Sequence, residues 1–170
     1  GVLKLADFGR RKGGPRAESW WALSCQTTAG CATFRSMQLL IVRHGIAEDR
    51  DAWAPHDDDA RPLTADGKKK MKEAAKGLQA LVPKVDLVAS SPLVRAMQTA
   101  TILPKVYGTA EPVQVDALVP GQHPPAFAAW LRTQLTRKAV AVVGHEPTLG
   151  TIISWLTAGI ERSFVELGKG

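Results

Sequence analysis

Three short apolar runs, at residues 38–42, 85–89 and 139–143, divide the chain from Met37 onward. Each run is rich in branched side chains and shorter than a usual buried helix, which is typical of strands covered on both faces. Such strands occur in parallel sheets, because the connecting helices pack on both faces of the sheet. The pattern therefore predicts a parallel sheet that contains these three strands.

Segments with helical periodicity lie between these runs and after the last of them. After Thr64, which is a suitable N-cap, apolar residues recur at intervals of three and four. A second helix is expected to begin with Ser91 as its cap and to be stopped by Pro104. Two more helices are expected to begin near Pro124 and Pro147. The alternation of strands and helices predicts an α/β protein, a three-layer α/β/α sandwich with a mostly parallel sheet.

Residues 1–36 show neither a helical nor an alternating pattern over ten residues. The chain begins with Gly, and Met37 directly precedes the first apolar run. We therefore interpret residues 1–36 as a poorly ordered extension that stems from cloning or from a misplaced start, and residues 37–170 as one domain. An Arg-rich organelle transit peptide is the alternative interpretation of residues 1–36.

The two cysteines, Cys25 and Cys31, both lie in this extension. No second pair and no nearby histidine would complete a zinc site with them. We interpret them as free thiols in a reducing compartment, which predicts a cytoplasmic protein.

Charge and hydropathy argue against two classes of partner, nucleic acids and membranes. Residues 1–36 carry +4 of the formal net charge of +6, which leaves +2 for residues 37–170. The lysines that follow Thr64 fit a solvated helix face, and no aromatic residues lie among them for base stacking. No apolar stretch reaches the ~20 residues that a spanning helix needs. We therefore expect neither nucleic acid nor a membrane as a partner.

Basic side chains follow all three predicted strands at their carboxyl ends, where an open α/β sheet places its ligand site. They are Arg43 and His44 after the first run, Arg95 after the second and His145 after the third. Four such side chains on one rim are costly unless an anion compensates their charge. Phosphate fits best, because guanidinium groups bind its oxygens in bidentate fashion. A neutral histidine in such a pocket can also attack phosphorus.

Three motifs resemble those of the histidine phosphatase superfamily, the phosphoglycerate mutase-like group. The first is Leu-Ile-Val-Arg-His-Gly at residues 40–45, the second spans residues 90–100, and the third is Val-Gly-His-Glu-Pro at residues 143–147. The Arg-Pro-Leu-Thr sequence at residues 61–64, followed by Gly67, resembles the SixA branch of phosphohistidine phosphatases. The resemblance runs from about Met37 to the end of the chain and implies a phosphoglycerate mutase-like fold.

The resemblance also implies roles for matching residues. His44 would accept the phosphoryl group, and a backbone carbonyl near Gly45 would fix its tautomer. The pocket around it would be formed by Arg43, Arg95 and His145, with Arg61 and Gly45 contributing to substrate binding. Neither a metal nor another cofactor is implied.

The proton donor is the first departure from the family pattern. Many members supply a glutamate after the second helix, where this chain offers only Asp116. Glu48 is the other candidate donor. A missing acid would hinder an alkoxide leaving group more than imidazole, so the departure favours a phosphoramidate substrate. The acidic run at residues 57–59 is interpreted as a surface loop, because three successive acids cannot all face one metal ion.

The carboxyl-terminal end is the second departure. Residues 163–167 are predicted to form a strand, and the resemblance leads us to expect a further strand or hairpin that covers the sheet edge. The chain ends at Gly170, so we interpret the domain as truncated there.

These observations favour a metal-independent phosphatase that removes phosphoryl groups from phosphohistidine on a partner protein. A phosphatase for small phosphoesters on the same scaffold is one alternative. A phosphoprotein-binding module without catalysis is another, and a nucleic-acid binder ranks last. We expect the protein to be a monomer.

Overall fold

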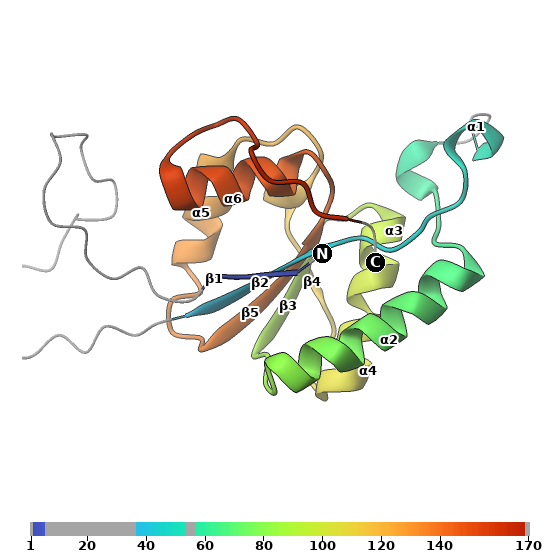
Figure 1. The fold of residues 1–170 in the computed structure, drawn as a ribbon, viewed down its shortest axis with the longest axis horizontal. Helices are drawn as coiled ribbons and strands as arrows, with labels where there is room; N and C mark the ends of the chain where they lie inside the picture. The colour runs from blue at the N-terminus through green and yellow to red at the C-terminus, as the bar shows by residue number, and fades with distance from the viewer. Residues whose placement is uncertain (1, 6–36, 54–56, 169–170) are drawn as a thin grey trace, which may run out of the picture.

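The computed structural model describes residues 2–5, 37–53 and 57–168 (Figure 1). Our interpretation of residues 1–36, with Cys25 and Cys31, falls mostly on residues outside these ranges. The exception is the segment Val2–Leu5, which forms a strand that we did not predict.

One five-stranded sheet organises the described residues. Its strand order is β1-β2-β5-β3-β4. The neighbours from β2 to β4 are parallel, as predicted, whereas β1 pairs with β2 in antiparallel fashion. The strands in chain order are β1 (Val2–Leu5), β2 (Gln38–Arg43), β3 (Leu87–Ser90), β4 (Val113–Gln114) and β5 (Ala139–Gly144).

Helices cover both faces of the sheet and confirm the three layers (Figure 1). One face carries α2 (Ala65–Leu81), α3 (Val94–Ala100) and α4 (Ile102–Tyr107). The other carries α5 (Pro124–Arg132) and α6 (Thr148–Ala158). The short α1 (Arg50–Trp53) and the 3-10 turns η1 (Asp58–Ala60) and η2 (Asp116–Leu118) lie in connecting loops.

Alternate residues of β2 enter two separate cores, which is why the apolar run is continuous. Leu40 belongs to one buried cluster with Met71 of α2. Ile41 belongs to the other cluster, with Phe127 of α5 and Ile152 of α6. Every residue of β5 is buried, so the centre of the sheet is shielded from water on both faces.

The predicted second helix is wrong in both its start and its end. The first helix after β3 begins at Val94, with Leu93 rather than Ser91 at the N-cap position. The helix breaks at Thr101, and Pro104 lies in the first turn of α4 instead of stopping a helix. Proline is tolerated there because the first-turn N–H groups have no partner within the helix.

The predicted strand at residues 163–167 is also absent from the described chain. Side chains of neighbouring elements hold the backbone of this segment instead: Ser154 Oγ accepts from Phe164 N at 3.0 Å, and Glu146 Oε1 accepts from Leu167 N at 3.0 Å. The outer edge of β2 is paired with β1.

None of the helices in the described ranges combines the length and the apolar character that a membrane crossing requires.

Candidate active site

His44 follows the last residue of β2, and the sheet fixes its place. Its backbone N–H donates to Gly144 O of the adjacent β5 at 3.1 Å. The ring atom Nδ1 lies 2.7 Å from Gly45 O. Because a carbonyl can only accept, Nδ1 carries the proton of the neutral ring and Nε2 carries the lone pair. The carbonyl contact that we expected near Gly45 is therefore present.

Gly45 fills a tight place between the nucleophile candidate and α2. A Cβ atom at this position would lie 2.7 Å from the Met71 side chain. The Gly45 N–H donates to Thr99 Oγ1 at 3.1 Å, and this hydroxyl donates to Arg95 O at 2.8 Å. The amide is thus engaged with α3, and a direct role of Gly45 in substrate binding stays a prediction.

The start of α2 is pressed against the loop after His44. Thr64 Oγ1 accepts from Gly67 N at 2.9 Å, which confirms the predicted N-cap, and donates to Ile46 O at 3.2 Å. A Cβ atom at Gly67 would collide with the Ile46 carbonyl. The helix therefore supports the His44 loop only because residue 67 has no side chain.

His145 follows β5, and its ring centroid lies 5.0 Å from that of His44. Its Nε2 lies 3.0 Å from Ser91 Oγ. Ser91 Oγ also accepts from Leu93 N at 3.4 Å, so its hydroxyl proton is available to Nε2. When the Ser91 hydroxyl donates to Nε2, the ring proton lies on Nδ1. The sequence placed His145 correctly but gave Ser91 the role of a helix cap.

Burial lowers the pKa of His145 from 6.5 to about 3, and the neighbouring His44 and Arg95 shift it in the same direction. His145 is therefore neutral at physiological pH in the ligand-free protein. In this state it contributes an N–H group rather than a full charge to the site.

Arg95 and Arg61 lie together because both bind Asp58. Asp58 Oδ2 is 3.2 Å from Arg95 Nη2, and Asp58 Oδ1 is 2.8 Å from Arg61 Nε. The side chains of Arg95 and Arg61 are 4% and 11% exposed, so both guanidinium groups are largely desolvated. The structure thus brings Arg61 to the cluster, from the loop that precedes α2, as the resemblance implied.

Arg43 ends β2, beside Gly144 of β5. It is half-buried, and its Nη1 donates to Leu167 O at 2.6 Å. The guanidinium group therefore links the sheet rim to the carboxyl-terminal segment. This contact with the segment at residues 163–167 was not predicted from the sequence.

Several buried nitrogen atoms of these residues have no hydrogen-bond partner. Within the described ranges, five buried side-chain nitrogen or oxygen atoms lack a partner, and three of them belong to this site: Arg43 Nε, Arg95 Nε and His145 Nδ1. Unpaired buried donors are costly, so native structures normally satisfy them with a ligand, water or protein atom. An oxyanion would satisfy these donors, since it offers several acceptor oxygens.

The two candidate proton donors do not join the cluster. Glu48 and Asp116 are exposed, and their carboxylates form no hydrogen bond or ion pair with the described site residues. Glu48 contributes through its backbone, because its carbonyl accepts from Arg61 Nη1 at 2.7 Å. No set of three or more potential metal-binding side chains occurs in the part of the chain that the structure describes.

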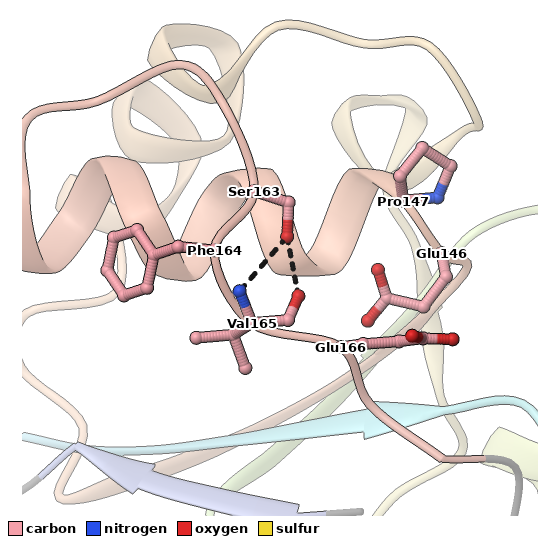
Figure 2. A pocket seen from close by; sticks show the side chains of 6 residues that line it. All are labelled: Glu146, Pro147, Ser163, Phe164, Val165 and Glu166. Carbon is pink, nitrogen blue, oxygen red and sulfur yellow. Dashed lines mark hydrogen bonds between the residues drawn. The ribbon is translucent and has the colours of Figure 1, made fainter.

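A cavity of about 550 Å³ lies beside this site (Figure 2). It is lined by Glu146 and Pro147, directly after His145, and by residues 163–166. Neither histidine and none of the arginines lines it. The Glu146 carboxylate accepts from the backbone N–H groups of Leu167 and Gly150, at 3.0 and 3.2 Å. We therefore assign Glu146 to holding the carboxyl-terminal segment rather than to binding an anion.

Sequence reasoning missed three side chains that shape the site. Asp58 was taken as part of a surface loop, Ser91 as a cap, and Thr99 only as a residue of the second helix. The spacing of Asp58 three residues before Arg61, and of Thr99 one helical turn after Arg95, is the signal that could have indicated them.

Comparisons with known proteins agree with this geometry. The model of the histidine phosphatase superfamily (branch 1) matches residues 39–119. An uncharacterized protein from Picosynechococcus sp. is 40% identical over 116 residues, which cover 67% of this chain and 69% of that protein.

Solved structures of SixA proteins resemble the fold. A protein histidine phosphatase SixA complexed with tungstate is 25% identical with a TM-score of 0.68, and the match covers 78% of this chain and 83% of that one. A SixA structure from Nakamurella multipartitia is 29% identical with a TM-score of 0.56, over 67% of this chain and 62% of that one. The chain therefore belongs to branch 1 of the histidine phosphatase superfamily and is a phosphatase of that family with a SixA-like fold.

Proposed function

We propose that this phosphatase removes phosphoryl groups from phosphohistidine on a partner protein, through a phosphorylated His44. The observation that carries the proposal is the group of unpartnered buried nitrogens on Arg43, Arg95 and His145, the residues that share this rim of the sheet with His44. These donors fit the oxygens of a phosphoryl group. The SixA structure solved with tungstate also holds an oxyanion, which agrees with a site of this kind.

In the proposed reaction the Nε2 lone pair of His44 attacks phosphorus. The new N–P bond forms while the N–P bond of the substrate breaks, and its electron pair leaves with the departing imidazole. The guanidinium groups and the His145 N–H stabilise the charge on the phosphoryl oxygens. A water molecule then attacks phosphorus in the same line, His44 leaves, and inorganic phosphate is released.

The carboxylates near the site favour a leaving group that needs no strong acid. Burial raises the pKa of Asp58, but the hydrogen bond from Arg61 and the charges of the nearby arginines outweigh it, so this pKa lies below 3.8. Asp58 is therefore ionised at neutral pH and is a poor proton donor. An imidazole can leave already protonated, whereas an alkoxide cannot, and this difference supports phosphohistidine over phosphoesters.

Turnover on a phosphohistidine protein, measured beside sugar phosphates and nucleotides, tests the substrate class. We expect phosphohistidine to be cleaved fastest, and faster cleavage of the esters would reverse this assignment. A rapid quench should trap an acid-labile, base-stable phosphoenzyme in the wild type. Its complete absence on every time scale shorter than turnover would favour a non-catalytic phosphoprotein-binding module. The cytoplasmic location and the monomeric state stay predictions.

A further inference from the structure

Asp58 makes contacts that the proposed reaction does not explain. Its Oδ1 accepts from Arg61 Nε at 2.8 Å, and its Oδ2 lies 3.2 Å from Arg95 Nη2. Its backbone carbonyl accepts from Arg95 Nη1 at 2.7 Å. Arg50 Nε lies 3.5 Å from Oδ1 on the solvent side. One residue of η1 therefore holds both Arg61 and Arg95, and it binds Arg95 through its side chain and its backbone together.

These contacts decide which side of the Arg95 guanidinium remains for a ligand. The group is planar, and its donors form a rigid fork. Asp58 contacts each terminal nitrogen once, so each of them keeps a second N–H group, and Nε is the buried donor without a partner. With its terminal nitrogens fixed, the Arg95 plane cannot rotate without breaking two contacts.

We propose that Asp58 is a positioning residue that orients Arg95 and Arg61 so that the Nε side of Arg95 receives the phosphoryl group. This inference rests on the proposed function. It assigns a role to a carboxylate within a site for an anion, where a negative charge would otherwise only repel the ligand.

The charges of the cluster agree with this role. Two largely desolvated guanidinium groups repel each other, and a carboxylate between them offsets that repulsion before any ligand binds. Asp58 itself is 40% exposed, so it faces the arginines from the solvent side rather than from the core. It can therefore hold the arginines without filling the space among the buried donors.

The same loop offers a matched control. Asp59 is the next residue, it is exposed, and it forms no ion pair within the described ranges. Asp59→Asn removes the same charge from the same loop but leaves the arginine contacts intact. Asp58→Asn removes the charge and keeps the side-chain size.

The experiment measures kcat/KM on a phosphohistidine protein and the affinity for inorganic phosphate. We expect Asp58→Asn to lower both about 10- to 100-fold, as loss of a supporting contact behind a ligand-binding group does. Asp59→Asn should stay within about twofold of the wild type. In the background of Arg95→Lys, which already lacks the fork, Asp58→Asn should have little further effect.

Several outcomes would overturn the inference. If Asp58→Asn and Asp59→Asn have the same kcat/KM and phosphate affinity, Asp58 does not position the arginines. If Asp58→Asn binds phosphate more tightly than the wild type, Asp58 competes with the ligand for the arginines. Additive losses in the Arg95→Lys background would show that Asp58 does not act through Arg95. A thermal melt checks folding, and Asp58→Glu, which keeps the charge, should recover part of the affinity if Asp58→Asn does not fold. If the wild type binds phosphate but cleaves no substrate, this result contradicts the proposed function but not the positioning role of Asp58.

Discussion

The carboxyl ends of β2 and β5 each carry a buried histidine, but the two rings are held by different groups. A backbone carbonyl holds Nδ1 of His44, and a serine hydroxyl from another element holds Nε2 of His145. The first contact leaves a lone pair on Nε2, whereas we expect the second, with the serine as donor, to leave a proton on Nδ1. The two partners therefore fit the different roles that the proposed reaction gives these side chains: His44 would attack phosphorus, and His145 would donate to an oxyanion.

Removing each histidine in turn should give the largest difference between the two strand ends. His44→Ala should nearly abolish turnover and the phosphoenzyme, because the attacking nitrogen is lost. His145→Ala should lower the rate on the order of 10² to 10³ but still form the phosphoenzyme, as for loss of an oxyanion donor. Quench-flow labelling of both variants measures this. A phosphoenzyme in His44→Ala, or its absence in His145→Ala, would contradict the different roles of the two histidines.

Substitution of Arg95 tests whether the site between the two histidines needs the planar fork of donors or only a positive charge. Arg95→Lys keeps the charge but loses the planar fork, so we expect most of a rate loss on the order of 10² to 10³. Steady-state kinetics on the phosphohistidine protein measure this loss. A near-normal rate would mean that the site needs only a positive charge at this place.

The low pKa of His145 should appear in the stability of the fold. The unfolded chain binds a proton at this residue below pH 6.5, but the folded protein does so only near pH 3. The free energy of unfolding should therefore fall as the pH falls through this window, by about 1.4 kcal/mol per pH unit. Urea unfolding at pH 7 and pH 5 should show this loss in the wild type and a smaller one in His145→Gln. Equal losses would contradict the assignment.

The smallest effect is expected at the hydroxyl that holds His145. Ser91→Ala should lower kcat/KM about tenfold, because the ring then samples both tautomers, a cost of about one hydrogen bond. Nitrogen chemical shifts of His145 should show mostly protonated Nδ1 in the wild type and a mixture in the variant. Ser90→Ala is the control, since this buried hydroxyl donates only to Ser91 O, at 2.9 Å. A mixed tautomer in the wild type would remove the contrast with His44.

Much of this arrangement could be predicted from the sequence, because burial and strand direction act locally. Continuous apolar runs identify β2, β3 and β5, and parallel strands bring the residues that follow them to one edge. That reasoning placed Arg43, His44, Arg95 and His145 at one rim, and the motif with Arg61 added a fifth residue to this group.

The parts that could not be predicted depend on contacts between distant elements. Whether Ser91 caps a helix or holds a histidine is decided by how close β5 lies, which the local sequence does not encode. Asp58 looks like any loop acid until the fold brings it to Arg95. Pro104 was misjudged because its effect depends on where the preceding helix breaks, at Thr101.

The close approach of Gly67 to the Ile46 carbonyl joins helix α2, which carries the lysines, to the loop that follows His44. We expect the exposed residues of α2 to tolerate substitution without moving this loop, because the close contact is made by the backbone at residue 67. A side chain at residue 67 would instead collide with the Ile46 carbonyl, so we expect it to push the helix away from the loop that carries His44.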